Sequence, residues 1–325
     1  MKCTNKLFIS LLITAMLIMT SCGSSKYSIP YSADSDISSF SVESNSKESA
    51  RADSFASKLC VSEANQSNPD INISENVSAA LFDVSNANTL YAKDIHESLY
   101  PASLTKVMTA IVALKNGTPD MILTASNNVK INDPSAQVLG LKAGDQMTLE
   151  QALNVLLIYS ANDVAILIAE GIGGSVEDFV NMMNAEANRI GATHTNFMNP
   201  HGLSDEEHYT TLYDLYLMTN EAIQYDMFNR IINTPEYELV YYDAAGNAKE
   251  TKISNTNLYL TGEHSIPSGV TVIGGKTGTT NAAGHCLILV SKDHKQNKLI
   301  SIIMKSESRE DMYTFTDSML QAAGK

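Results

Sequence analysis

Two serines and two lysines are spaced in this sequence so that they could form one site for nucleophilic catalysis. Ser103 and Lys106 form a Ser-x-x-Lys pattern, Ser160 opens a Ser-Ala-Asn triplet, and Lys276 opens a Lys-Thr-Gly triplet. A serine hydroxyl is a poor nucleophile at neutral pH and needs a base beside it. One Ser-x-x-Lys arises by chance in most chains of this length, but the three patterns in this order indicate a serine enzyme that forms an acyl intermediate.

Lys106 can serve as that base only if its side chain reaches Ser103 and gives up its proton. Residues three apart lie on the same face of a helix, so a helix that begins at Ser103 would bring the two side chains together. Burial and a nearby positive charge both lower the pKa of a lysine. Lys276 could supply that charge, and Ser160 could relay the proton. At the N-terminus of the helix, the backbone N–H of Ser103 could also stabilise a developing oxyanion.

The periodicity of apolar residues predicts the elements that must position this site. Alternating apolar runs bounded by turn residues indicate strands at residues 77–84, 89–93, 237–242, 271–276, 284–291 and 299–305. Helical spacing and capping residues indicate helices at residues 103–114, 149–159, 163–170, 175–191, 210–225 and 309–323. Because strands lie at both ends of the chain, we expect one sheet built from both ends and a helical lobe. The three motifs would then meet in the cleft between lobe and sheet.

Longer blocks surround the three motifs and carry a family resemblance. They are the segments 100–106 (Tyr-Pro-Ala-Ser-Leu-Thr-Lys), 199–203 (Asn-Pro-His-Gly-Leu), 255–257 (Asn-Thr-Asn), 274–280 (Gly-Gly-Lys-Thr-Gly-Thr-Thr) and 283–284 (Ala-Gly). From about residue 76 to the C-terminus the chain resembles the serine-type D-alanyl-D-alanine carboxypeptidases, the low-molecular-mass penicillin-binding proteins. The resemblance implies an α+β, β-lactamase/transpeptidase-like fold, in which an antiparallel sheet is flanked by helices and joined to a helical lobe. It implies removal of the terminal D-alanine from peptidoglycan pentapeptides that end in D-Ala-D-Ala.

The resemblance also implies how the catalytic residues act. Ser103 would be the acylated nucleophile, Lys106 would accept its proton, and Ser160 would relay protons. The backbone N–H groups of Ser103 and Thr279 would form the oxyanion hole. β-Lactams would acylate the same serine as covalent inhibitors, and the chemistry implied needs neither a metal nor another cofactor.

A second set of residues would bind the substrate if the resemblance holds. Asn162 would position the substrate amide, and Lys276 and Thr277 would hold the terminal carboxylate of the peptide. Gly278 completes the Lys-Thr-Gly triplet of the binding site. Arg309 matches an arginine that also binds this carboxylate in some members of the family.

The N-terminus predicts export and a lipid anchor. Lys2 and Lys6 precede the apolar run Leu7–Met19, which fits a signal peptide and is short for a membrane span. The tetrapeptide that ends at Cys22 resembles a bacterial lipobox, so residues 1–21 would be removed and Cys22 would carry lipid. The protein would then be extracytoplasmic and held at the cell membrane. The alternative is an ordinary secretion signal that happens to end near a cysteine.

Residues 22–69 are expected to be a lipidated cysteine followed by a disordered linker, because serine is abundant and large apolar residues are few. Residues 70–325 would form the catalytic domain. Many relatives carry a further β-rich C-terminal domain and an anchor helix, and neither fits a chain that stops one helix after its last strand. Export permits a disulfide between Cys60 and Cys286, but one pair without a spacing signature favours two free thiols.

Two rival readings keep the acylating serine. A class A β-lactamase would need a Glu-x-x-Leu-Asn element between the second and third motifs. Residues 163–275 contain none, and the sequence around Glu186 lacks the pattern. A lipoprotein that binds or senses β-lactams without turnover would keep acylation and lose deacylation, and detectable release of D-alanine would exclude it.

Other classes of protein find less support. A zinc carboxypeptidase would use a His-Glu-x-x-His element. His194, His201 and His208 are evenly spaced but form no such element, so loop and cap roles are favoured. The Gly-x-Ser-x-Gly of a Ser-His-Asp hydrolase is missing as well. The formal net charge of −14 argues against nucleic acid as a partner.

Overall fold

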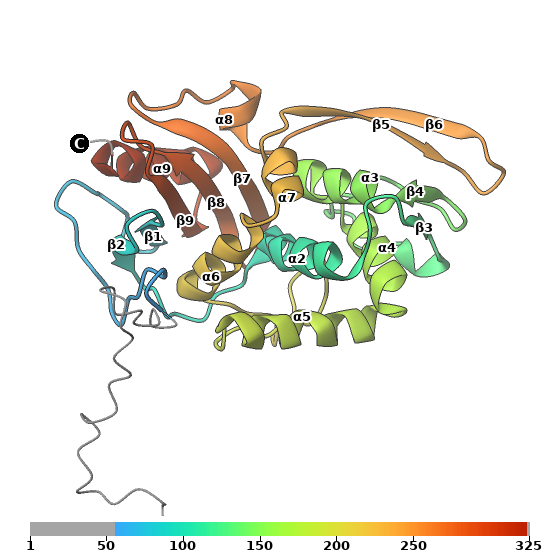
Figure 1. The fold of residues 1–325 in the computed structure, drawn as a ribbon, viewed down its shortest axis with the longest axis horizontal. Coiled ribbons are helices and arrows are strands. Elements are labelled where there is room, and N and C mark those ends of the chain that lie inside the picture. The colour runs from blue at the N-terminus through green and yellow to red at the C-terminus, as the bar shows by residue number, and fades with distance from the viewer. Residues whose placement is uncertain (1–55, 324–325) are drawn as a thin grey trace, which may run out of the picture. The chain divides into compact units, whose positions relative to one another are not determined.

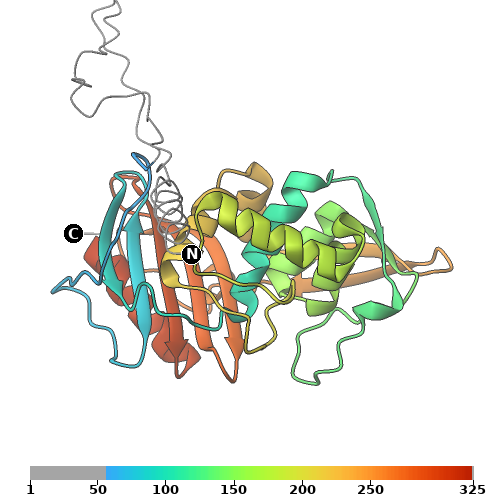
Figure 2. The ribbon, with the colours of Figure 1, turned by 90° about the horizontal axis from the view of Figure 1, so that it is seen from below.

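The structure, a computed structural model, describes residues 56–323. The predicted signal peptide, Cys22 and the predicted linker up to residue 55 lie outside the described residues. The described part contains a five-stranded sheet next to a helical lobe, which Figures 1 and 2 show in two perpendicular views. Between residues 56 and 323, none of the helices combines the length and the apolar character needed to cross a membrane.

The linker ends earlier than predicted, because the chain from Cys60 onward already packs on the domain. Cys60 is fully buried, and its backbone N–H donates a 2.8 Å hydrogen bond to the hydroxyl of Tyr216. Gln66 and Ala92 exchange two backbone hydrogen bonds. The prediction that the linker extends to residue 69 is therefore wrong at its C-terminal end. A serine-rich composition conceals such anchoring, since backbone hydrogen bonds can hold small polar residues in place.

The main sheet joins the two ends of the described chain, as predicted. Its strand order is β2-β1-β9-β8-β7, and all neighbouring strands are antiparallel. The strands are β1 (Ser78–Asp83), β2 (Asn88–Lys93), β7 (Thr271–Thr280), β8 (Gly284–Lys292) and β9 (Lys298–Ser306). β1 therefore pairs with β9, although almost the whole sequence of the domain lies between these two strands. β7, which contains the Lys-Thr-Gly triplet, is an edge strand.

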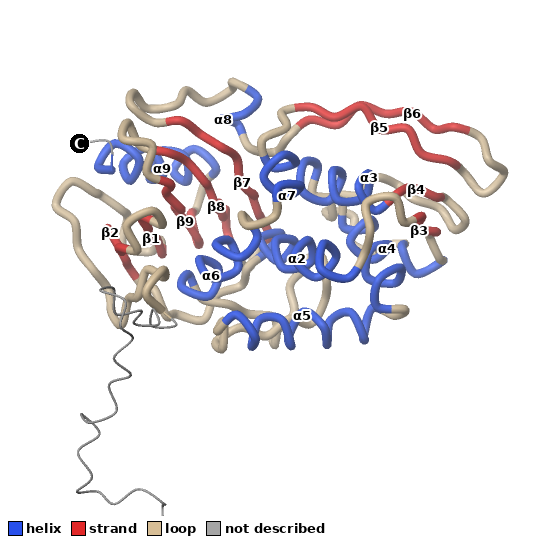
Figure 3. Tube along the Cα trace, viewed as in Figure 1, coloured by secondary structure: helices blue, strands red, loops and turns tan. Residues whose placement is uncertain are grey.

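Most of the helices lie between this sheet and a second group of strands, as the blue elements of Figure 3 show. The helices of the described residues are the 3₁₀ helix η2 (Ala102–Thr105), α2 (Lys106–Asn116), the 3₁₀ helix η3 (Asn127–Val129), α3 (Leu149–Asn154), the π-helical turn η4 (Val155–Tyr159), α4 (Asn162–Gly173), α5 (Val176–Ile190), α6 (Leu212–Ala222), α7 (Asp226–Ile232), α8 (Leu258–Thr261) and α9 (Arg309–Ala323). The predicted helices are all present in this set. The short α7 and α8 were not predicted.

Both faces of the main sheet are covered, which explains why its strands are apolar on both sides. Successive side chains of a strand point to opposite faces. Leu81 and Leu287 pack in one cluster with α9, whereas their neighbours Phe82 and Ile288 belong to the larger core shared with the lobe.

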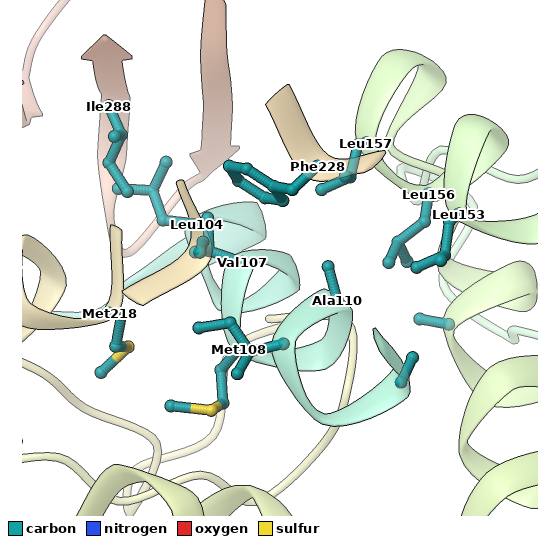
Figure 4. Close-up of a cluster of buried hydrophobic side chains, with 14 of the residues drawn as sticks. Leu104, Val107, Met108, Ala110, Leu153, Leu156, Leu157, Met218, Phe228 and Ile288 are labelled. Carbon is teal, nitrogen blue, oxygen red and sulfur yellow. The ribbon is translucent and has the colours of Figure 1, made fainter. Parts of the chain in front are cut away.

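The helix that carries the Ser-x-x-Lys motif is anchored in this larger core. α2 contacts α4, α5 and α6. Figure 4 shows the side chains of Leu104, Val107 and Met108 among those of the sheet residue Ile288 and the lobe residue Leu156. Because the core is close-packed, the position of Ser103 is set by apolar contacts on both sides.

A second, four-stranded sheet was not predicted. Its order is β3-β4-β5-β6, formed by β3 (Ile122–Thr124), β4 (Gln146–Thr148), β5 (Glu236–Tyr242) and β6 (Ala248–Ser254). Only β5 was expected. β3 and β4 are too short to show a pattern, and β6 is mostly exposed and polar. Its register comes from the turn at Asp243, whose carboxylate accepts hydrogen bonds from the backbone N–H groups of Ala245 and Asn247.

Candidate active site

Ser103 and Lys106 are in contact, as the spacing of the motif predicts. Ser103 lies in η2 and Lys106 is the first residue of α2, and Lys106 Nζ donates a 2.9 Å hydrogen bond to Ser103 Oγ. The same Nζ donates 2.6 Å hydrogen bonds to Asn162 Oδ1 and to the backbone carbonyl of His201. Lys106 is fully buried, whereas Ser103 is partly exposed. The hydroxyl is therefore accessible from one side and bound to the lysine on the other.

The surroundings of Lys106 favour its neutral form. Burial lowers the pKa of Lys106 well below its ordinary value, and the positive charge of Lys276 lowers it further. The carboxylate of Asp163 acts in the opposite direction but does not outweigh these two causes. A lysine whose pKa is lowered in this way can accept a proton near neutral pH.

Ser160 lies at a break in the helical lobe. Thr148 caps the N-terminus of α3, and its side chain accepts a hydrogen bond from the backbone N–H of Gln151. The helix widens into η4 and stops at Ser160, which has a φ of 69°. A left-handed conformation is costly for a residue other than glycine. Ser160 therefore needs surrounding contacts to hold it.

Lys276 supplies one of these contacts from the main sheet. Its Nζ donates a 2.9 Å hydrogen bond to Ser160 Oγ and a 2.7 Å hydrogen bond to the backbone carbonyl of Thr277. The side chain is 1% exposed, and burial lowers the pKa of Lys276 to about 7. Each lysine thus contacts a different serine of the motif set.

The remainder of the Lys-Thr-Gly segment lies against Ser103 and its neighbours in η2. Gly278 packs so closely on η2 that a Cβ atom there would lie 3.0 Å from the backbone nitrogen of Ser103. Thr277 donates a hydrogen bond through its hydroxyl to Thr256 Oγ1 at 2.5 Å. Thr279 Oγ1 lies 3.1 Å from Nδ1 of His285. A side chain at position 278 would therefore press on η2, and β7 or η2 would have to shift to make room for it.

A cleft of about 680 Å³ opens over these residues and is lined by both the lobe and the sheet. The predicted site residues that line it are Ser103, Ser160, Asn162, Thr277, Gly278, Thr279 and Arg309. Lys106 and Lys276 are buried behind the cleft surface. Arg309 is the exposed first residue of α9, and its side chain forms no hydrogen bond or ion pair with any other residue of the described range 56–323. The structure thus brings all the predicted residues of the domain to one place.

Asn162 has a contact that the sequence did not predict. Its Oδ1 is 2.6 Å from Lys106 Nζ, and the side chain is 4% exposed. Asn162 therefore helps to orient Lys106 in addition to lining the cleft. The predicted contact with a substrate amide stays a prediction.

Two further residues shape the site and were missed. His201 contributes its backbone carbonyl to Lys106, and such a contact leaves no trace in side-chain types. Asp163 accepts hydrogen bonds from the backbone N–H groups of Leu139, Gly140 and Leu141. This buried carboxylate holds the segment that follows Gln137, a residue of the cleft lining. An aspartate directly after the Ser-Ala-Asn triplet was the one signal available.

The three evenly spaced histidines have separate local roles. His201 Nδ1 accepts a hydrogen bond from the backbone N–H of Leu203, and His208 Nδ1 accepts one from Met198. His194 is exposed. The predicted loop roles of His201 and His208 are therefore confirmed. Among residues 56–323, no three His, Cys, Asp or Glu side chains are arranged to hold a metal ion.

Two other expectations concern cysteines and a glutamate. Cys60 and Cys286 are both free and buried, so the expected unpaired thiols are confirmed. Glu186 forms ion pairs with Lys115 and Arg189 and is not part of the cleft lining. It therefore does not take the position of a β-lactamase glutamate.

Known proteins resemble this chain in both sequence and fold. A family model described as D-alanyl-D-alanine carboxypeptidase matches residues 61–308. The D-alanyl-D-alanine carboxypeptidase DacF of Bacillus subtilis is 32% identical over 240 residues, which is 72% of this chain and 58% of DacF. DacA of Haemophilus influenzae is 30% identical over 69% of this chain and 55% of its own length. The chain thus spans less than two thirds of these curated relatives.

Solved structures share the fold. A DD-transpeptidase from Streptomyces superposes with a TM-score of 0.71 at 24% identity and covers 77% of this chain and 97% of its own. A putative penicillin-binding protein homologue from Mycobacterium tuberculosis superposes with a TM-score of 0.68 at 26% identity, covering 78% and 92%. The predicted α+β, transpeptidase-like fold is confirmed. Because the family model matches most of the chain, this protein belongs to the D-alanyl-D-alanine carboxypeptidase family.

Proposed function

We propose that this protein is a serine-type D-Ala-D-Ala carboxypeptidase that removes the terminal D-alanine from peptidoglycan stem peptides through an acyl-enzyme on Ser103. One observation carries the proposal. Two buried lysines, both with lowered pKa values, each place Nζ 2.9 Å from the Oγ atom of one of two serines that line the same cleft. Family membership and the transpeptidase-like fold add support.

The contacts of Lys106 indicate how the nucleophile is activated. A neutral amine has two N–H groups and one lone pair. Asn162 Oδ1 and the His201 carbonyl can only accept, so they engage the two N–H groups. The lone pair is then directed at the third neighbour, Ser103 Oγ, whose hydroxyl can turn and donate. Ser103 loses its proton to Lys106 as its oxygen attacks the carbonyl carbon of the penultimate D-alanine.

The remaining steps return that proton and release the products. The tetrahedral oxyanion is stabilised by the backbone N–H groups of Ser103 and Thr279. The peptide C–N bond breaks, and the nitrogen of the leaving D-alanine takes the proton from Lys106 by way of Ser160. Water then attacks the ester on Ser103, with Lys106 again accepting a proton, and the shortened peptide leaves.

The same cleft offers groups for the substrate. The exposed edge of β7 leaves backbone groups free to pair with an extended peptide, and the amide of Asn162 lies across the cleft. The terminal carboxylate is held by Lys276, Thr277 and Arg309, in charge-assisted contacts that are stronger than neutral ones. β-Lactams imitate the same acyl group and acylate Ser103.

The location of the protein is part of the proposal. The signal-like residues 1–21 and the lipobox-like sequence before Cys22 support export and lipid attachment at the membrane. The serine-rich residues that follow would tether the domain within reach of the cell wall.

Two measurements test the proposal. The soluble domain is incubated with labelled penicillin, and the adduct is mapped by peptide mass spectrometry. A synthetic pentapeptide that ends in D-Ala-D-Ala is then digested, with its C-terminal amide as the matched control. We expect label on Ser103, release of D-alanine from the free acid and much slower cleavage of the amide. Acylation without any D-alanine release would instead identify a β-lactam-binding protein without turnover, and label elsewhere would reject Ser103.

A further inference from the structure

The residue before the nucleophile has a strained backbone. Ala102 has a φ of 47°, in the left-handed region that residues with a Cβ atom rarely adopt. Its side chain is 1% exposed, and Ser103 follows directly. Such a conformation persists only when neighbouring contacts impose it. The contacts of Ala102 therefore help to decide where Ser103 points.

Two residues hold the carbonyl of Ala102. The hydroxyl of Thr105 donates a 2.8 Å hydrogen bond to the Ala102 carbonyl oxygen. Gly202, from the loop that also supplies the His201 carbonyl, packs on the same group, and a Cβ atom at position 202 would lie only 1.8 Å from the oxygen. The turn at Ala102 is thus held from two sides, by Thr105 of η2 and by Gly202 of the loop formed by residues 197–208.

The Thr105 hydroxyl is in turn oriented by His208. Thr105 Oγ1 lies 2.9 Å from His208 Nε2, and both residues are almost completely buried. Burial lowers the pKa of His208 to about 4, so the ring is neutral at neutral pH. The backbone N–H of Met198 donates to Nδ1, so the single ring proton lies on Nε2 and is donated to Thr105. The Thr105 hydroxyl therefore donates its own proton to the Ala102 carbonyl. The hydrogen bonds then run in a single direction, from His208 to Thr105 and from Thr105 to Ala102.

We propose that His208 is a positioning residue for the nucleophile. By orienting the Thr105 hydroxyl, it keeps the Ala102 carbonyl in place and maintains the left-handed turn that holds Ser103 Oγ against Lys106 Nζ. His208 touches no reacting atom and acts on the reaction through Thr105 and Ala102. The inference rests on the proposed function for its effect on rate, but its effect on geometry can be measured separately.

Two matched pairs of variants isolate the hydrogen bonds from packing. In His208→Gln the side-chain amide nitrogen can occupy the place of Nε2 and donate to Thr105. In His208→Asn the shorter amide can serve only Met198. Thr105→Ser keeps the hydroxyl, and Thr105→Val keeps the volume without it. His194→Asn, on an exposed histidine of the same region, is the control for histidine loss in general.

The readouts are the single-turnover rate of acylation by penicillin at saturation, the dissociation constant of the initial complex, and the thermal midpoint. We expect His208→Asn and Thr105→Val to acylate roughly 10–100-fold more slowly, since small misplacement of a reacting group has effects of this size. His208→Gln, Thr105→Ser and His194→Asn should stay within about threefold of wild type. The dissociation constant should be unchanged. Equal losses in the Asn and Gln variants, or none in either, would overturn the proposal.

Crystal structures of the four network variants decide the same question without activity. In His208→Asn and Thr105→Val the separation between Ser103 Oγ and Lys106 Nζ should exceed hydrogen-bonding distance. In the matched variants His208→Gln and Thr105→Ser the hydrogen bond should remain. An unchanged contact in all four would reject the positioning role. If the wild-type protein is not acylated at all, the proposed function fails, and these structures still test His208.

Discussion

Lys106 and Lys276 reach one cleft from different parts of the fold, and the charge of Lys276 lowers the pKa of Lys106. Lys106 begins α2 in the lobe, and Lys276 lies on the edge strand β7 of the sheet. The two residues also differ in their partners, Ser103 for Lys106 and Ser160 for Lys276. This arrangement couples the basicity of one lysine to the charge of the other and allows their roles to be separated.

Lys106→Ala should slow acylation by penicillin about 10²–10⁴-fold, which is the usual loss when a general base is removed. Lys115→Ala is the matched control, because Lys115 lies on the same helix, is partly exposed and pairs with Glu186 outside the cleft. The control should acylate at the wild-type rate. The measurement is the acylation rate together with the thermal midpoint. Acylation of Lys106→Ala at a near-wild-type rate would rule out this lysine as the base.

Lys276→Met should shift the pH dependence of acylation. Lys106 must be neutral to accept a proton, and the charge of Lys276 lowers its pKa. Without that charge the pKa of Lys106 rises, so the acidic limb of the rate profile should move to higher pH. Acylation rates from pH 5 to 10 for both proteins test this shift. A limb that stays in place, or moves to lower pH, would contradict the coupling between the two lysines.

The same variant should change how stability depends on pH. In the unfolded chain Lys276 has its ordinary pKa of 10.5, and burial lowers the folded value to about 7. Between these values the unfolded state binds more protons, so the free energy of unfolding contributed by Lys276 increases as the pH rises. Lys276 therefore destabilises the wild type most below pH 7 and least above 10.5.

Denaturant unfolding of wild type and Lys276→Met at pH 7 and pH 10 measures this difference. The wild type should gain stability relative to the variant as the pH rises. A constant difference between the two proteins would show that Lys276 keeps its ordinary pKa in the folded state.

Gly278→Ala should impair acylation without removing any reactive group. The new Cβ atom would lie 3.0 Å from the backbone nitrogen of Ser103 and 3.2 Å from the Cβ atom of Ala102, so η2 or β7 has to shift. A displaced nucleophile can lower the rate by about 10²-fold. Acylation kinetics and a crystal structure check this outcome. Wild-type kinetics in the variant would show that the contact between β7 and η2 tolerates a side chain.

Cys22→Ala should release the protein from the membrane fraction or leave it unprocessed. Stable anchoring takes two or more acyl chains, which a lipidated N-terminal cysteine would carry. Cells that produce wild type or variant are labelled with a radioactive fatty acid and fractionated. Equal membrane association of both proteins, with no label on the wild type, would point to an uncleaved N-terminal segment as the anchor.

The sequence predicted the main sheet and the contact between Ser103 and Lys106 because each leaves a pattern in side-chain types. Long strands covered on both faces read as apolar runs, as in β8 and β9. The Ser103–Lys106 contact follows from helical spacing. The features that the sequence did not predict depend on turns and backbone contacts, which leave no pattern in side-chain types. β6 is a polar strand paired through a turn, and the contact of His201 with Lys106 uses only the backbone. The anchoring of Cys60 involves one small residue inside a serine-rich stretch.

The pairing of β1 with β9 sets an order of assembly for the domain. Whether the chain emerges from a ribosome or on the far side of a membrane, β1 appears long before β9, so the centre of the sheet stays open until nearly all of the domain has emerged. Contacts so distant in sequence slow folding, because a long loop has to close before they form. β7, which completes the cleft beside Ser103, docks on β8 and so depends on the same late event. The emerging chain therefore carries Ser103 long before the cleft around that residue exists.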